Sequence, residues 1–472
     1  MSKHKYVRWL TAAAALVFGS ACDGNLHDDL LTVQTPDIIT IEAQNSQAGA
    51  QAWYIAAVGD FAQAFCGDRA NNTPLGVCVP VGMFTDELFT ARAGIDGWDK
   101  RTVDNTTIPQ STWNQLMLAH TRSLRAEHLL VKYPPATGLN TQLATLKANE
   151  GFTLLFLAEN YCNGLPLWDG KDETNIETVT LSTTELYAAA VVQFDSALTL
   201  IGTADPQIRR LALVGKARTI VDQAKAGSQA ASYATAAALV GEVPTSFVFN
   251  AAYSASSQGM ENGLYDWGFN TPNWGASNAE GINGVNFVQA KDPRVNIDPV
   301  KTVACQDGTR CNIFNHYNKP DAPVALATGI EARLIEAEAQ LAAGNSAAWL
   351  ATLNLLRSTP QKYGTVTTNG ALPKTYPDDN VLRAGLDPLA DPGTPEGRIS
   401  LHFRERGFWL YLTAHRLGDF RRLIRQYGRN ADAVFPTGAY FKGGAYGTDV
   451  VLPPNNTETN NPNWKACTDK LP

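Results

Sequence analysis

The stretch FRERGFWLYLTAHRLGDFRRL, residues 403–423, carries five arginines but only two acids, Glu405 and Asp419. Large apolar residues recur among these charges, which predicts one helix and its exit with the aromatic side chains packed inward. Arginines beside such acids are expected to form buried or half-buried ion pairs. We therefore interpret this stretch as a structural clamp made by the following residues: Glu405, Arg406, Arg416, Asp419 and Arg422.

A metal site in the same stretch is the alternative interpretation. His402 and Glu405 are three residues apart, a spacing that occurs in metal half-sites. However, Arg404, Arg406 and Arg416 would repel a cation, and the sequence has no second pair of this kind. We expect no metal and no other cofactor.

Composition limits the possible partners. The chain has 472 residues, of which 44% are hydrophobic, so it can bury a large core. Charged residues make up only 18%, and the net charge is -7. Because a negative protein is not attracted to phosphate backbones, a nucleic acid is not an expected partner.

Apolar residues at helical spacing predict a mainly α fold. The expected scaffold helices lie mainly in residues 46–65, 111–244, 329–358 and 396–425. Short glycine-containing links join them in pairs, a pattern typical of an α-solenoid such as tetratricopeptide repeats. Residues 337–357, AEAQLAAGNSAAWLATLNLLR, form one such unit. Periodicity alone leaves an irregular helical bundle open.

Local signals add detail to this scaffold. Ser182 followed by Glu185 predicts a capping box, and Gly202 predicts the end of the same helix. Strands are expected to be few and short, at TSFVFN (245–250) and VVLP (450–453). The remaining Gly-, Asn- and Thr-rich segments predict long irregular loops.

The N-terminus has the features of an export signal over residues 1–21. MSKHKYVRW is positive, LTAAAALVF is apolar but too short to span a bilayer, and GSAC places small residues before Cys22. This order resembles a lipoprotein signal, in which Cys22 becomes the acylated anchor. Cleavage by ordinary signal peptidase, with Cys22 a plain thiol, is the alternative.

The other cysteines favour disulfides, because they are even in number in an exported chain. The first expected pair brackets GDRANNTPLGV, the second brackets the turn-forming run QDGTR, and the third would be long-range. None has a CxxC spacing or a nearby histidine cluster, so zinc is not expected. The pairs are Cys66 with Cys78, Cys305 with Cys311, and Cys162 with Cys467.

Catalytic motifs are absent from the sequence. It contains no GxSxG, no HExxH and no glycine-rich phosphate loop. Acids crowd the segment TDELFTARAGIDGWDK (85–100), where two of Asp86, Glu87, Asp96 and Asp99 could act as a glycosidase pair. Solvated loop acids are the alternative.

Aromatic residues in polar loops are the main ligand-binding candidates. They occur in YDWGFNTPNWG (265–275) and DGWDK (96–100). Such rings can stack on sugars or peptide side chains while amides and carboxylates accept hydrogen bonds from hydroxyls. The alternative is that these rings pin the loops to the helical body. The candidates are Trp98, Asp96, Tyr265, Trp267, Asn273 and Trp274.

Several segments together resemble the RagB/SusD family of outer-membrane nutrient-uptake lipoproteins, in the right order along nearly the whole chain. They are TWNQLMLAHTRS (112–123), LATLKANEGFTLLFLAENYCNGLPL (143–167), KDPRV (291–295), ISLHFRERGFWLYLTAHRLGDFRRL (399–423) and VVLPPNNTETNNPNW (450–464). The most specific match is Glu405-Arg406, His415-Arg416, Asp419 and Arg422. The chain departs from the family at Ala414-His415, where relatives carry Glu-Gly.

The resemblance implies one SusD-like domain over residues 22–472, with four tetratricopeptide-like helix pairs and a loop-rich binding region mainly at 66–110 and 245–325. It implies a lipid-anchored protein, exposed at the outer-membrane surface, that passes oligosaccharides or peptides to a SusC-like TonB-dependent transporter without catalysis. A secreted glycan-active hydrolase and a scaffold that binds only protein are the alternatives.

Overall fold

The computed structural model describes residues 44–70, 73–104, 110–170, 177–295, 297–358, 386–464 and 467–468. The expected signal peptide and Cys22 lie outside the described residues.

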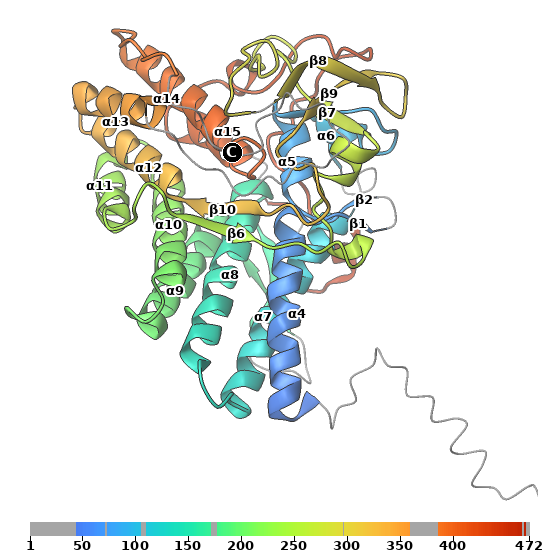
Figure 1. Ribbon diagram of the computed structural model, residues 1–472, viewed down its shortest axis with the longest axis vertical. Helices are drawn as coiled ribbons and strands as arrows, with labels where there is room; N and C mark the ends of the chain where they lie inside the picture. The colour runs from blue at the N-terminus through green and yellow to red at the C-terminus, as the bar shows by residue number, and fades with distance from the viewer. Residues whose placement is uncertain are drawn as a thin grey trace, which may run out of the picture.

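Four pairs of helices form the scaffold (Figure 1). Within each pair the two helices pack together, and each pair packs on the next. This arrangement confirms the mainly α, tetratricopeptide-like prediction. The pairs are α4 (Gln47–Cys66) with α7 (Ser111–Lys132), α8 (Leu139–Asn160) with α9 (Thr183–Ile201), α10 (Pro206–Asp222) with α11 (Gln229–Val240), and α12 (Gly329–Ala342) with α13 (Ser346–Ser358).

The helix boundaries follow from capping chemistry. The Ser182 hydroxyl accepts from the backbone N–H of Glu185, and the Glu185 carboxylate accepts from the Ser182 N–H, so the predicted capping box is confirmed. Gly202 ends the same helix with φ of 50°, a conformation that glycine adopts without a steric penalty. Asp205 caps α10, whose first residue is Pro206.

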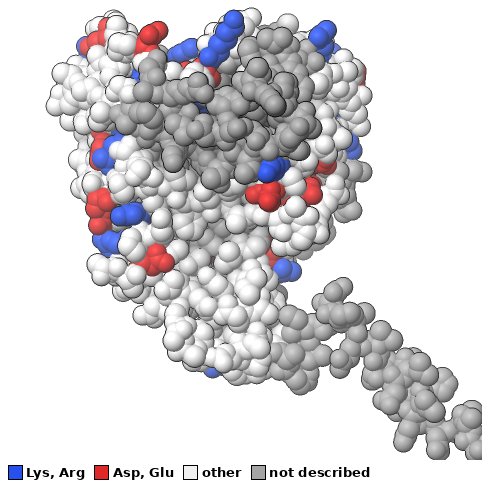
Figure 2. Space-filling view, viewed as in Figure 1, with Lys and Arg blue, Asp and Glu red and all other residues white. Residues whose placement is uncertain are grey.

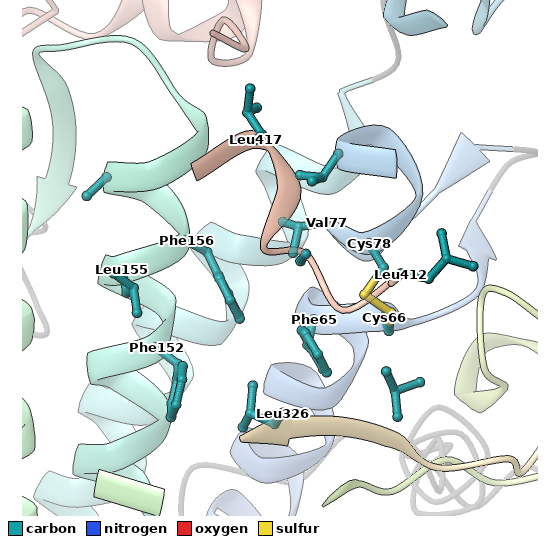
Figure 3. Close-up of a cluster of buried hydrophobic side chains, with 14 of the residues drawn as sticks. Phe65, Cys66, Val77, Cys78, Phe152, Leu155, Phe156, Leu326, Leu412 and Leu417 are labelled. Carbon is teal, nitrogen blue, oxygen red and sulfur yellow. A yellow bond between two sulfur atoms is a disulfide. The ribbon is translucent and has the colours of Figure 1, made fainter. Parts of the chain in front are cut away.

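Aromatic stacking and small residues allow the helices to approach closely. A Cβ atom on Gly215 would lie 2.5 Å from the Phe194 ring, and one on Gly151 would lie 2.8 Å from it, so α8, α9 and α10 meet around this phenylalanine. Phe65 of α4 stacks on Phe156 of α8 with ring centroids 5.5 Å apart, in the core shown in Figure 3. Burial of such rings is the main source of stability.

The strands are short and form five antiparallel two-stranded sheets among the described residues. The predicted strand at 245–250 is found as β6, but residues 450–453 contribute only a single bridge between Leu452 and Tyr161. The sheets are β1 (Arg69–Ala70) with β2 (Thr73–Pro74), β3 (Leu88–Thr90) with β7 (Trp274–Ala276), β4 (Leu165–Trp168) with β5 (Thr178–Leu181), β6 (Val248–Ala251) with β10 (Val324–Thr328), and β8 (Ile297–Ala304) with β9 (Arg310–Phe314).

Residues 403–423 depart from the expected single helix. The chain forms α14 (Pro395–Trp409), then a turn, and then α15 (Arg416–Arg425). Leu412 and Ala414 in the turn have φ of 57° and 59°, which no α-helix can include. Two further helices are short, α5 (Cys78–Phe84) and α6 (Asp96–Asp99).

Candidate functional site

Three of the five arginines in residues 403–423, Arg406, Arg416 and Arg422, form buried ion pairs. Arg406 contacts Asp419 across the turn between α14 and α15, with 2.8 Å between Nη2 and Oδ1. Arg416 contacts Asp86, which follows α5, at 2.7 Å. Arg422 pairs with Glu338 of α12. The clamp therefore joins α15 to segments that lie far away in the sequence.

Glu405 has two partners that the sequence did not suggest. Arg294 donates to its Oε2 at 2.6 Å, and Arg357 of α13 donates to its Oε1 at 2.9 Å. Arg294 belongs to the KDPRV segment, and it is also held by Asp292. The Glu405 carboxylate thus connects α14 to two other segments, the loop before β8 and helix α13.

A histidine extends the network without carrying a charge. Arg218 of α10 donates to His415 Nε2 at 2.8 Å and to Glu159 at 2.6 Å. Burial and the neighbouring Arg218 lower the pKa of His415, so the ring is neutral and can accept this bond. In the described part of the chain, no group of three or more His, Cys, Asp or Glu side chains is arranged to hold a metal ion.

The candidate catalytic acids are mostly buried and engaged. Glu87 accepts from the Leu412 N–H at 3.1 Å, and burial raises its pKa to about 8. Asp99 accepts from the Thr90 N–H at 2.7 Å, and burial raises its pKa to about 7. Asp86 is bound to an arginine, and Asp86, Glu87 and Asp99 are each at most 1% exposed, whereas the two carboxylates of a glycosidase must reach the substrate.

The three candidate tryptophans are core residues. Trp98 and Trp274 are each 1% exposed, and Trp267 is 4% exposed. Trp267 packs edge to face on Trp274 with centroids 5.4 Å apart, and the Arg92 guanidinium lies 4.1 Å from the centre of the Trp267 ring. These rings offer no free face for stacking in this conformation, so they pin the loops to the body.

Other aromatic side chains of the same region do reach the surface. Tyr265 and Phe269 are half-buried and stack at 6.3 Å around the short π-helix η2 (Asp266–Asn270). Phe441 is 52% exposed and packs edge to face on Phe89 of β3 at 5.4 Å. Asp96 is also partly exposed and bonds to Lys100 at 2.8 Å. We call Tyr265, Phe269 and Phe441 the surface rings.

Phe441 was missed by the sequence analysis. It lies in GAYFKGGAYG (438–447), an aromatic- and glycine-rich run that could have identified a loop of this kind. Its ring also contacts that of Tyr440 at 4.8 Å.

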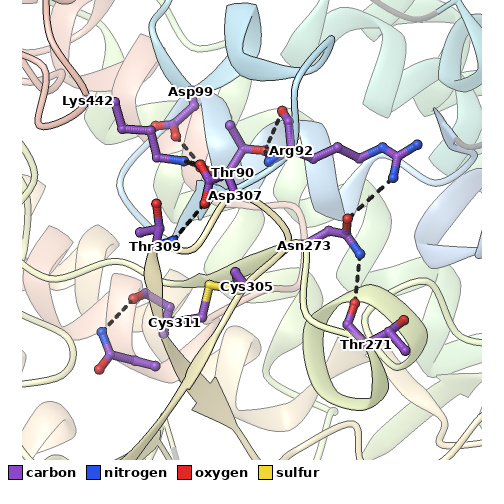
Figure 4. The surroundings of a disulfide bond; sticks show 12 residues. Thr90, Arg92, Asp99, Thr271, Asn273, Cys305, Asp307, Thr309, Cys311 and Lys442 are labelled. Atoms are coloured by element: carbon purple, nitrogen blue, oxygen red, sulfur yellow. Dashed lines mark hydrogen bonds and ion pairs between the residues drawn. A yellow bond between two sulfur atoms is a disulfide. The ribbon is translucent and has the colours of Figure 1, made fainter.

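The loops that present the surface rings are braced by polar contacts and a disulfide (Figure 4). Cys305 is bonded to Cys311 in the β8–β9 hairpin, and the next residue after Phe441, Lys442, contacts Asp307 of this hairpin at 2.5 Å. Asn273 is buried; its amide donates to the Thr271 carbonyl at 2.7 Å. The site is therefore a supported loop surface rather than a set of free loops.

The other cysteines are also bonded. Cys66 at the end of α4 is joined to Cys78 at the start of α5, with 5.2 Å between the Cα atoms. Cys162, which follows α8, is joined to Cys467 near the C-terminus, with 5.6 Å between the Cα atoms.

Charged side chains are sparse on the face shown in Figure 2, as the low content of charged residues in the sequence leads one to expect. On this face, positive and negative side chains are interspersed and much of the area is uncharged. Among the described residues, no helix has both the length and the apolar character needed to cross a bilayer.

Comparison with known proteins identifies the fold. No family model and no curated protein matches the sequence. A SusD/RagB family protein from Bacteroides thetaiotaomicron is 13% identical, with a TM-score of 0.61 over 88% of this chain and 94% of that one. A SusD superfamily protein from Bacteroides fragilis gives the same identity and TM-score over 88% and 97%.

A third similar structure is surface glycan-binding protein A from Bacteroides thetaiotaomicron. It is 14% identical, with a TM-score of 0.57 over 87% of this chain and 96% of that one. These comparisons show that the chain has the same fold as these SusD-like proteins, which agrees with the resemblance seen in the sequence.

Proposed function

We propose that this protein is a cell-surface glycan-binding protein that captures oligosaccharides at the surface rings. The observation that carries the proposal is the SusD-superfamily fold over most of the chain, because solved structures with this fold include proteins named as carbohydrate-binding and surface glycan-binding. Fold alone does not assign a ligand, so the chemistry of the loop surface must agree with it.

The loop surface has suitable chemistry for a sugar. Aromatic rings stack on the apolar faces of pyranose rings, while polar side chains beside them exchange hydrogen bonds with hydroxyls. Asn270 and Thr271 are exposed next to Phe269, and Lys442 follows Phe441. A peptide with apolar side chains could use the same rings, so oligosaccharide and peptide are both tested below.

Export and anchoring are part of the proposal. The features of residues 1–22 support a lipoprotein signal with Cys22 as the acylated residue of a single domain over 22–472. Two or more acyl chains hold a protein on a membrane stably. We infer an outer-membrane location and delivery of the captured ligand to a SusC-like TonB-dependent transporter. Fatty-acid labelling of the wild type and of Cys22→Ala tests the anchor.

A glycan-active hydrolase finds no support in the structure. Asp86, Glu87 and Asp99 are buried and hydrogen-bonded, and the partly exposed Asp96 is ion-paired with Lys100. A scaffold that binds only protein would leave the surface rings without a ligand, which the next experiment detects.

The test is a glycan and peptide array followed by calorimetry on the mature protein. Replacing Phe441 or Tyr265 by Ala should weaken binding of the ligand found by about two- to tenfold each, because one aromatic contact contributes about 0.5–1.5 kcal/mol. Leu355→Ala, which removes an exposed apolar side chain from α13, is the control and should not change affinity. Absence of any ligand, or equal affinity in all variants, would reject the proposed site.

A further inference from the structure

A second concave site lies on the helical scaffold, apart from the surface rings. It is a pocket of about 600 Å³ between the start of α9, the turn from α10 to α11 and the C-terminal half of α15. Its volume is in the range of small-ligand sites. Among the described residues, its lining includes three cationic side chains, Lys225, Arg421 and Arg425, and no Asp or Glu.

Arg421 is the most unusual member of this lining. Its side chain is 2% exposed, and its Nη1 donates to the carbonyl oxygens of Ala158, at 2.9 Å, and Glu159. Its Nε is buried and has no hydrogen-bond partner in the part of the chain that the structure describes. A buried charged group with an unused donor is costly unless a partner reaches it.

No carboxylate within the described residues pairs with Arg421 or Arg425. Arg425 donates to the backbone oxygen of Asp222 at the end of α10. The acids that face Arg421 are already engaged, since Glu159 binds Arg218 at 2.6 Å and the Asp222 carboxylate lies 3.4 Å from Arg422. By contrast, Arg406, Arg416 and Arg422 on the same two helices are all ion-paired.

The positive charge of Arg425 also makes the buried charge of Arg421 less favourable. Burial, together with the charge of Arg425, lowers the pKa of Arg421 to about 10. A negative group in the pocket would offset this repulsion and could accept charge-assisted hydrogen bonds.

Helix geometry adds to the positive potential. Helix α11 begins at Gln229, and its N-cap residue Ser228 makes no side-chain capping bond, so the first N–H groups are not satisfied by a cap. Ser228 and Ser232 line the pocket, as does Thr184 in the first turn of α9. The uncapped N-terminus of α11 thus borders a cavity that is lined by three cationic side chains, whereas the N-terminus of α9 is already capped by Ser182 and Glu185.

We propose that this pocket binds an oxyanion, and that the hydroxyl groups around it select one carried on a hydroxylated molecule, as in an acidic saccharide. Hydroxyl and amide side chains of Thr184, Ser232 and Asn163 match sugar hydroxyls, while Arg421 and Arg425 match the carboxylate. Free inorganic phosphate shares the anion chemistry. The choice of an acidic saccharide as the ligand rests on the proposed function, whereas the anion site itself does not.

The experiment is calorimetric titration of the mature protein with three probes. They are a galacturonic acid trisaccharide, the matching neutral galactose trisaccharide and inorganic phosphate. The acidic trisaccharide should bind at least about tenfold more tightly than the neutral one, and added salt should weaken it. Binding of phosphate without the trisaccharide supports the anion site and assigns it to a free anion. Binding of neither anion overturns the proposal.

Variants locate the binding. Lys225→Gln and Arg425→Gln should each weaken anion binding by about tenfold or more, since a hydrogen bond to a charged group contributes about 1.5–3 kcal/mol. Lys132→Gln removes the same charge from the exposed end of α7 and is the matched control. Unchanged affinity in both pocket variants overturns the proposal.

Two further variants keep the result interpretable. Because Lys225 and Ala226 are exposed, Lys225→Gln and the pocket-filling Ala226→Trp should fold normally, which a thermal melt checks, even if Arg425→Gln does not. Phe441→Ala should leave phosphate binding unchanged. If the surface-ring proposal fails, neutral glycans do not bind while anions still titrate; if the pocket proposal fails, the reverse pattern appears.

Discussion

Replacing Arg416 by Met tests whether the clamp is held by paired buried charges. Arg416 Nε and Nη2 donate to the two oxygens of Asp86 at 2.7 and 2.9 Å, and both side chains are buried. The guanidinium also lies 4.4 Å from the centre of the Phe420 ring. Met fills a similar volume but leaves Asp86 with one remaining donor, the Val285 N–H at 2.9 Å.

The expected loss of unfolding free energy is about 3–5 kcal/mol, because removing one member of a buried pair leaves an uncompensated charge. The cation–π contact adds about 0.5–1 kcal/mol to this loss. The double variant Asp86→Asn with Arg416→Met removes both charges of this buried pair. It should therefore be less destabilised than Arg416→Met alone.

Equilibrium urea unfolding, followed by tryptophan fluorescence and by circular dichroism, measures these differences. The matched control is Arg209→Met, because Arg209 pairs with Glu242 at 2.7 Å on the surface and should contribute less than about 1 kcal/mol. Similar losses for Arg416→Met and Arg209→Met would refute the argument. So would a double variant that is less stable than Arg416→Met.

Three further predictions concern pH and packing. Burial raises the pKa of Glu87 to about 8, so the folded state keeps a proton that the unfolded chain releases. The free energy of unfolding of the wild type should therefore fall as pH rises from about 5 to 8. In urea unfolding, Glu87→Gln should lose less stability over this pH range. Gly215→Ala should lower the free energy of unfolding by about 1–3 kcal/mol, since the new Cβ would meet Phe194. Gly59→Ala should be neutral or stabilising in the same assay, because no atom lies within 4 Å of its Cβ position. Trp98→Ala should cost about 3–5 kcal/mol in thermal and urea unfolding, as expected for a core ring.

The outcomes that would contradict these predictions are specific. Equal pH dependence of wild type and Glu87→Gln would mean that this carboxyl does not hold a proton in the folded state. Equal effects of the two glycine variants would remove the packing argument. A fully stable Trp98→Ala protein with lost ligand binding would return Trp98 to the binding site.

The helical half of the molecule could be predicted well from local sequence. Apolar spacing, the Ser182 capping box and the stop at Gly202 are decided within a few residues, and the structure confirms them. The break between α14 and α15 could not be predicted in this way. Leu412 and Ala414 adopt positive φ in a turn where the Leu412 N–H is bound by the distant Glu87 and the Arg406–Asp419 pair joins α14 to α15.

The aromatic pattern named the candidate rings, but it did not distinguish exposed rings from buried ones. Of the candidates, Tyr265 reaches the surface while Trp98, Trp267 and Trp274 turn inward, and the exposed Phe441 lies outside the loop region that was expected to bind ligand. Composition does not distinguish these outcomes, because both kinds of ring lie beside polar residues in the sequence.

The amino-acid sequence by itself determined where most scaffold helices lie, since helical periodicity and capping depend on neighbours along the chain. Only the tertiary structure decided which rings are exposed and which arginines pair with a carboxylate of the described residues. Among these residues, Arg416 contacts Asp86 and Arg421 contacts only backbone oxygens, because segments hundreds of residues apart meet around α15. Exposure and charge pairing are properties of that meeting, so no local pattern contains them.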